Sequence, residues 1–244
     1  MSQESFTVAV PDVVLADLRE RLAKVRWPGD FANAHWEYGT NQAYLQELVE
    51  YWLNEYDWRK HEREMNTFSH YKTDIDGVPI HFIHEPGKGP NPTPLILSHG
   101  WPWTFWDFQK VIRPLTDPVA FGGDPNDSFD VIIPSLPGYG FSTPLTTSGI
   151  NFWRTADLWV KLMQDVLGYK KFAAQGGDWG AIITAQLGHK YVDRLIGCHL
   201  NLMIPLDVFV GSMPEAGEYG QEEAGWYDGN MNFFAEESGY SALQ

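Results

Sequence analysis

The order of short apolar segments and amphipathic segments between residues 94 and 202 constrains the fold more than any other feature of the sequence. Residues 94–98, 129–133, 171–175 and 195–202 have the length and apolar character of buried strands. Strands that alternate with helices pair in parallel, because each helix returns the chain to the same edge of the sheet. We therefore predict an α/β fold with a mostly parallel sheet and helices on both faces. The intervening helices are expected to end near residue 115 and to span residues 152–167 and 181–190.

Helices are predicted in the first part of the chain, where apolar residues recur at helical spacing over 12–25, 41–55 and 58–65. The pattern then changes to two strands joined by Asp76-Gly77, a dipeptide typical of a hairpin turn. Beyond residue 205 the pattern weakens, and only 231–239 is expected to be helical. The chain is accordingly expected to comprise a helical N-terminal region at 1–66, an α/β core at 67–204 and the start of a further segment at 205–244.

Charge and composition exclude several classes of partner. A chain of 244 residues is long enough to bury a sizeable core, and its net charge of −15 disfavours nucleic acid and anionic membrane surfaces. Eight Asp and Glu residues and no Lys or Arg follow Arg194. This run predicts either a solvated acidic face or a segment whose basic partners lie beyond residue 244.

The sequence predicts neither a disulfide nor a membrane span. The single cysteine, Cys198, cannot form an internal disulfide, and its apolar strand suggests a place in the core. Residues 1–11 lack the basic region and apolar run of a signal peptide. No apolar stretch approaches the ~20 residues that a membrane-spanning helix needs. We expect a soluble, cytoplasmic protein.

The candidate catalytic motif is Gly176-Gly177-Asp178-Trp179-Gly180, which lies between an expected strand and an expected helix. Hydrolases place a nucleophile on such a sharp turn, and the glycines give it room. The positive end of the following helix favours an ionised, nucleophilic carboxylate. An Asp before a helix is also an ordinary N-cap, so the motif alone leaves both interpretations open.

A second motif, His99-Gly100-Trp101-Pro102, follows the strand that ends at residue 98. With a nucleophile elbow, such a loop supplies one backbone donor of an oxyanion hole, and the residue after the nucleophile supplies the other. The predicted donors are the N–H groups of Trp101 and Trp179. His99 itself is expected to fix the loop, and the peptide bond before Pro102 is a candidate for the cis form.

Three motifs, in the order HGWP at 99–102, PSLPGYGFS at 134–142 and GGDWG at 176–180, together resemble the epoxide hydrolases of the microsomal type. The resemblance implies the α/β-hydrolase fold over residues 67–204, with a lid beginning in 205–244. The N-terminal region contributes RWPGD at 26–30, YGTN at 38–41 and YWLNEYDWRK at 51–60 to the resemblance.

The resemblance also implies a mechanism. Asp178 would attack a carbon of a small apolar epoxide and form an alkyl ester, which water then hydrolyses to a vicinal diol. Tyr240, in the segment that resembles the start of the lid, would donate a proton to the opening ring; packing on the core is the other role open to it. No cofactor or metal is implied, and no His, Cys or Asp cluster has the spacing of metal ligands.

The sequence departs from the family pattern in its histidines. In the family, the second lid tyrosine, the orienting acid and the water-activating histidine come later in the chain than the position of Gln244, and all eight histidines here precede the lid. His189, on the helix after the elbow, is expected roughly 16 Å from Asp178. We therefore expect this chain to lack its water-activating base. A sheet without its last strands would expose an edge, and an exposed edge can pair with another chain. A homo-oligomer is therefore an alternative that the sequence leaves open. The histidines are His35, His61, His70, His81, His84, His99, His189 and His199.

Two alternatives remain open at this point. A haloalkane or haloacid dehalogenase also uses an aspartate at the elbow, but such enzymes usually carry Asn or Glu where this chain has Trp101. The N-terminal helices and Tyr240 also favour the epoxide family. A binding module without activity, or an inactive fragment, is the second alternative, because the expected base is missing.

Overall fold

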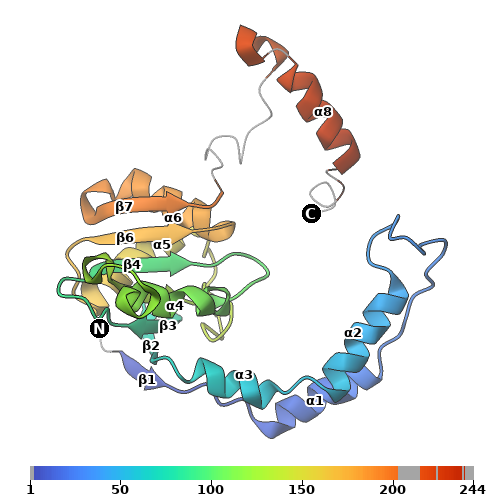
Figure 1. The fold of residues 1–244 in the computed structure, drawn as a ribbon, viewed down its shortest axis with the longest axis horizontal. Coiled ribbons are helices and arrows are strands. Elements are labelled where there is room, and N and C mark those ends of the chain that lie inside the picture. The colour runs from blue at the N-terminus through green and yellow to red at the C-terminus, as the bar shows by residue number, and fades with distance from the viewer. Residues whose placement is uncertain (1–2, 203–214, 224, 238, 240–244) are drawn as a thin grey trace. The chain divides into compact units, whose positions relative to one another are not determined.

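The computed structural model describes residues 3–202, 215–223, 225–237 and 239. The chain divides into two compact units, residues 1–202 and 203–244, and the sheet and the candidate site both lie in the first (Figure 1). The strands are β1 (Glu4–Phe6), β2 (His70–Ile75), β3 (Val78–Glu85), β4 (Thr93–Ser98), β5 (Phe129–Pro134), β6 (Phe172–Gly176) and β7 (Leu195–Leu200). The helices are α1 (Asp12–Ala23), α2 (Gln42–Asn54), α3 (Trp58–Met65), α4 (Gln109–Thr116), α5 (Phe152–Lys161), α6 (Trp179–Lys190) and α8 (Trp226–Glu237).

The sheet is mixed, with the strand order β1-β2-β3-β5-β4-β6-β7. The pairings β1–β2, β2–β3 and β3–β5 are antiparallel. The pairings β5–β4, β4–β6 and β6–β7 are parallel. The predicted parallel sheet of alternating strands and helices is therefore confirmed for β4 to β7. The first half is antiparallel because Asp76-Gly77 closes a hairpin in which Ile75 faces Val78. Strand β1 was not expected from the sequence.

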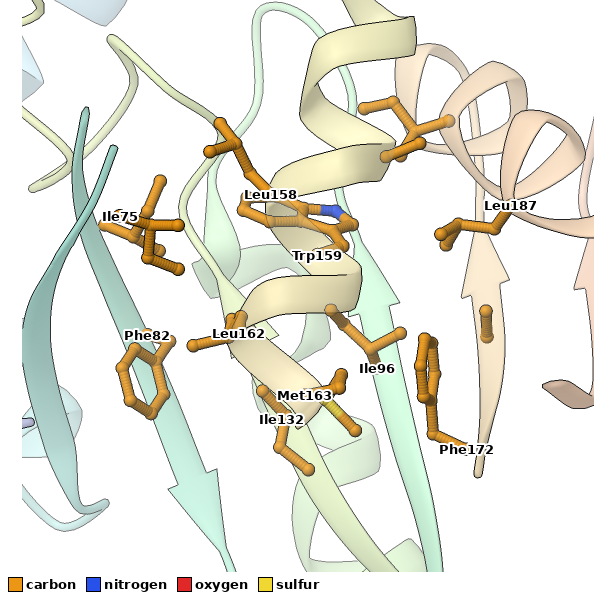
Figure 2. Packing of buried hydrophobic residues seen from close by; sticks show 14 of the residues in the cluster. Ile75, Phe82, Ile96, Ile132, Leu158, Trp159, Leu162, Met163, Phe172 and Leu187 are labelled. Carbon is orange, nitrogen blue, oxygen red and sulfur yellow. The ribbon is translucent and has the colours of Figure 1, made fainter. Parts of the chain in front are cut away.

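The period of two along the central strands separates the core into two layers. Ile96 and Ile132 point to one face, where they pack with Trp159 and Met163 beneath α5 (Figure 2). The intervening residues of the same strands, Leu95, Leu97, Val131 and Ile133, point to the other face and pack with Ile112 of α4 and Met65 of α3. A sheet buried on both faces explains why these strands read as continuous apolar runs in the sequence.

The Trp159 side chain fixes the carboxyl end of β4. It is fully buried, and its Nε1–H donates to the Ser98 hydroxyl oxygen at 3.0 Å. The indole thus fills the layer under α5 while its polar atom has a partner, as a buried Trp requires. Ser98 is the last residue of β4, so this contact fixes the point from which the next loop leaves the sheet.

Side-chain bonds tie the N-terminal segment to α3. The Asn66 amide accepts from the Val8 N–H at 2.9 Å and donates to the Val8 carbonyl at 2.8 Å. The buried Glu62 carboxylate accepts from the Val10 N–H at 2.7 Å. By contrast, α1 and α2 contain no buried residue.

Strand β7 forms one edge of the sheet and is largely exposed. The expectation that Cys198 lies in the core is therefore wrong: its side chain is exposed. An apolar strand at a sheet edge has the same sequence pattern as a central one, so the sequence could not separate the two. In the part of the chain that the structure describes, no helix is long and apolar enough to cross a bilayer.

Buried histidines should make stability depend on pH. Burial lowers the pKa of His81 to about 2, and the charges of His70 and Lys72 act in the same direction. Because the folded pKa lies below the unfolded one, the stabilisation is complete above about pH 6.5 and is lost as pH falls through that value toward 2. We expect His81 alone to lower the free energy of unfolding by ~2 kcal/mol between pH 7 and pH 5.

Urea denaturation at the two pH values measures this difference. The His81→Gln variant removes the titrating ring, so its loss of stability between pH 7 and pH 5 should be smaller than that of the wild type. Equal losses in both proteins would show that His81 is not kept neutral by folding.

Candidate active site

Asp178 occupies a sharp turn between β6 and α6. Its backbone has φ 52° and ψ −127°, a conformation that L-residues rarely adopt. Gly176 ends β6 and Gly177 leads into the turn. Such strain at a single polar residue between a strand and a helix is typical of a nucleophile elbow, where it lifts the side chain above the sheet edge.

Two glycines allow backbone segments to approach where any side chain would collide. A Cβ on Gly180 would lie 2.0 Å from the Ser98 carbonyl oxygen, so α6 packs directly against the end of β4. A Cβ on Gly100 would lie 2.4 Å from both Cβ and Oδ1 of Asp178. The loop after β4 and the elbow after β6 therefore meet only because these positions lack side chains.

The Trp101 N–H donates to Asp178 Oδ1 at 2.8 Å. This bond joins two of the motifs found in the sequence. Trp179 follows Asp178 as the first residue of α6, so its backbone N–H lies at the positive end of that helix. The peptide bond between Trp101 and Pro102 is cis, as expected.

His99 is buried and bonds only to backbone in the contacts the structure describes. Its Nε2 accepts from the Leu136 N–H at 3.0 Å, so the proton is on Nδ1, which donates to the Gly100 carbonyl at 2.9 Å. Burial lowers the pKa of His99, which keeps the ring neutral and this arrangement intact. The Gly100 carbonyl and the Trp101 N–H belong to one planar trans peptide, so they point in opposite directions. By holding the carbonyl, His99 aims the N–H at Asp178.

A pocket of about 460 Å³ opens beside Asp178. Its walls include Trp103, Asp107 and Asn201, none of which the sequence analysis singled out. Burial raises the pKa of the Asp107 carboxyl. Asn201 could have been found, because it follows β7 at the carboxyl edge of the sheet next to the elbow, where ligands bind in α/β folds.

A smaller, mainly apolar pocket of about 300 Å³ lies along the start of α6. Trp179 and Phe152 stack in its wall with ring centroids 5.9 Å apart. Tyr139 also lines it; burial raises the pKa of the Tyr139 hydroxyl, and the negative charge of Asp178 raises it further. Tyr139 was within the PSLPGYGFS motif, but nothing in the sequence distinguished it from a turn residue.

The remaining predicted residue, Tyr240, lies outside the described residues. His189 is near the end of α6, and His199 is exposed on β7. Among the residues that the structure describes, no three His, Cys, Asp or Glu side chains are placed to hold a metal ion.

Two family models match the sequence. The model described as "Epoxide hydrolase N terminus" matches residues 3–108, and that described as "alpha/beta hydrolase fold" matches residues 93–237. A "Putative epoxide hydrolase" of Stigmatella aurantiaca is 45% identical over 98% of this chain and 53% of its own length. "Epoxide hydrolase 1" of Oryctolagus cuniculus is 39% identical over 82% of this chain and 45% of its own length. The chain thus spans about half the length of these curated relatives.

Solved structures give the same result. An enantioselective mutant of the epoxide hydrolase from Aspergillus niger superimposes with a TM-score of 0.80 at 28% identity, over 100% of this chain and 62% of that chain. The juvenile hormone epoxide hydrolase of the silkworm Bombyx mori gives a TM-score of 0.74 at 32% identity, over 82% of this chain and 53% of that chain. The chain therefore belongs to the alpha/beta hydrolase fold family, and its N-terminal region is that of the epoxide hydrolases.

Proposed function

We propose that this chain carries the alkylation site of an epoxide hydrolase, with Asp178 as the covalent nucleophile. The observation that supports this most is the hydrogen bond from the Trp101 N–H to one oxygen of a carboxylate held on a strained elbow. A carboxylate can attack the sp³ carbon of an epoxide directly, and the ester formed can later be cleaved at its own carbonyl.

The two oxygens of Asp178 take different parts in the proposed step. Oδ1 is held by the Trp101 N–H, so Oδ2 is the attacking atom. As the bond from Oδ2 to the epoxide carbon forms, the bond from that carbon to the ring oxygen breaks. The ring oxygen keeps the electron pair and takes a proton from a donor, for which Tyr240 is the candidate by resemblance.

Hydrolysis of the ester would use the same donor. Water adds to the Asp178 carbonyl carbon, and negative charge develops on Oδ1, which is already bonded to the Trp101 N–H. The N–H of Trp179 is the second proposed donor. Collapse of this intermediate breaks the bond between the carbonyl carbon and Oδ2, and it releases the diol with Oδ2. Water activation needs a base, and none of the histidines is proposed for that role here.

The surroundings of Asp178 favour an apolar substrate. Trp103 and Phe108 line the larger pocket, and Tyr139, Phe152 and Trp179 line the smaller one. Aromatic walls bind flat apolar groups well. A styrene-type or arene-type epoxide is the substrate class that we propose.

Intact-protein mass spectrometry after incubation with a styrene-type epoxide tests the proposal. We expect one covalent adduct on the wild-type chain and none on Asp178→Ala. Asp178→Asn is the matched control, because its amide keeps the size and shape of the carboxylate but not the nucleophile. An adduct that persists in both variants would remove Asp178 from the reaction. No adduct on the wild type would favour a binding module, and faster reaction with a haloalkane would favour a dehalogenase.

A methyl group at Gly100 should block the site without altering the core. Gly100→Ala places a Cβ 2.4 Å from Asp178 Oδ1, so the loop or the carboxylate must move. Misplacement of a reacting group by about 1 Å costs roughly a hundredfold in rate, and we expect a loss of that order in the rate of adduct formation. The control is Gly197→Ala on β7, whose Cβ would meet nothing within 4 Å. Equal rates for the two variants would contradict the proposed close approach.

Loss of the Tyr240 hydroxyl should slow ring opening. We expect Tyr240→Phe to form the adduct at least about tenfold more slowly, because proton donation by a positioned group contributes at least that much. Tyr227→Phe, a substitution in α8, is the matched control. An adduct rate in Tyr240→Phe equal to that of the control would leave Tyr240 with a packing role.

A further inference from the structure

Two buried histidines that the proposed mechanism does not use lie on neighbouring strands. His70 on β2 and His81 on β3 are 3% and 0% exposed. Their rings are close, with His70 Nδ1 and His81 Nε2 2.9 Å apart, and Phe105 packs edge-on against both. Polar rings kept in an aromatic core need all their hydrogen bonds satisfied, so the question is what their partners are.

The partners determine where every proton lies. His70 Nε2 is 2.8 Å from the Met65 carbonyl, which can only accept, so that nitrogen carries the proton. In the neutral ring Nδ1 is then an acceptor, and His81 Nε2–H must donate to it. His81 Nδ1 is left as an acceptor for the Ser135 hydroxyl at 2.9 Å. The hydrogen bonds therefore run in one direction, from Ser135 through His81 and His70 to the end of α3.

Strand β3 also holds the start of the 135–142 segment through its backbone at the same position. The Ser135 N–H donates to the His81 carbonyl at 2.8 Å. The His81 N–H donates to the Ser142 hydroxyl oxygen at 2.9 Å, and that hydroxyl donates to the Ser135 carbonyl at 2.8 Å. The side chain of His81 adds the bond that orients the Ser135 hydroxyl within this small network.

The next residue of the segment leads to the candidate active site. The Leu136 N–H donates to His99 Nε2, and His99 Nδ1–H holds the Gly100 carbonyl. That carbonyl shares its peptide plane with the Trp101 N–H, which bonds Asp178 Oδ1. Each contact along this path lies between 2.8 and 3.0 Å.

We propose that His81 is a positioning residue for the oxyanion hole, and that it acts through Ser135, Leu136 and His99 on the Trp101 N–H. The effect on catalysis rests on the function proposed above, whereas the direction of the hydrogen bonds is independent of that function. Loss of the His81 acceptor leaves the Ser135 hydroxyl buried without its partner, which the protein relieves by moving Ser135. Leu136 moves with it, and the Trp101 N–H turns away from Asp178.

Three substitutions distinguish the roles of the two nitrogens of the His81 ring. His81→Asn keeps an acceptor where Nδ1 lies and so keeps the bond from Ser135. His81→Gln keeps a donor where Nε2 lies and so keeps the bond to His70. His81→Phe keeps the ring shape and neither bond. All three variants lose a buried histidine. If the role of His81 were merely structural, the rate of adduct formation would be lowest in the least stable variant and highest in the most stable one.

The expected result is a rate that follows the Ser135 bond. We expect the rate constant of adduct formation with styrene oxide to fall about tenfold in His81→Gln and His81→Phe. In His81→Asn it should stay within about twofold of wild type, and the epoxide concentration at half-saturation should be unchanged in all three. Rates that follow the melting temperatures of the variants, or that stay at the wild-type value in all three, overturn the proposal.

Nuclear magnetic resonance separates this proposal from the proposed function. Long-range proton–nitrogen spectra of the wild type should show a protonated Nε2 on His70 and His81 and a protonated Nδ1 on His99. The Trp101 amide resonance should move in His81→Gln and His81→Phe and stay in place in His81→Asn. If the wild type forms no adduct, the proposed function fails, and these spectra still decide the positioning role. The positioning role is overturned if the histidines have other tautomers, or if the Trp101 resonance stays in place in all three variants.

Discussion

The bond from the Trp101 N–H to Asp178 Oδ1 joins the loop after β4 to the turn after β6, and the candidate site depends on it. These strands are neighbours in the sheet, with Ser98 opposite Gly176, so their carboxyl ends already lie side by side. The loop and the turn must also come close enough for the Trp101 N–H to reach the Asp178 carboxylate. Gly100 and Gly180 do this by having no side chain, and Asp178 does it by adopting a rarely populated conformation.

That arrangement needs a rigid support, because a strained residue persists only where its surroundings fix it. The support comes from both core layers. Trp159 under α5 bonds the Ser98 hydroxyl at the end of β4. On the other side, His81 joins Ser135 of the 135–142 segment to β3, and His99 joins Leu136 of that segment to the loop after β4, through hydrogen bonds with one possible direction each. Buried polar networks of this kind are stable only when each member has a partner, which makes them specific as well as costly to disturb.

Much of the fold could be predicted from the sequence, because the period of its apolar residues reports burial directly. The helix at Trp58–Met65 and the hairpin at Asp76-Gly77 were predicted as the structure has them. Strand β1 was missed, since three residues are too few to show a period. The exposed position of Cys198 was missed because the pattern of a strand does not report whether it lies at an edge.

The sequence predicted those residues of the candidate site that belong to local motifs. It did not predict the residues that only tertiary contacts bring to the site. Strand, glycine and helix signals together located Asp178, and the loop motif located Trp101. Tyr139 approaches Asp178 from another part of the chain, and no local pattern marks it. Asn201 is marked only by its place just after β7, which the strand order sets beside the elbow. The contact of His70 with His81 is diagonal across the hairpin, because the register sets Lys72 opposite His81, and no pattern within either strand marks it.

A crystal structure of the chain after reaction with a styrene-type epoxide tests the central claim most directly. The account predicts an ester on Asp178 through Oδ2, with the carbonyl oxygen Oδ1 still within hydrogen-bonding distance of the Trp101 N–H. It would be contradicted by an ester whose carbonyl points away from Trp101, or by an adduct on another side chain beside an unmodified Asp178.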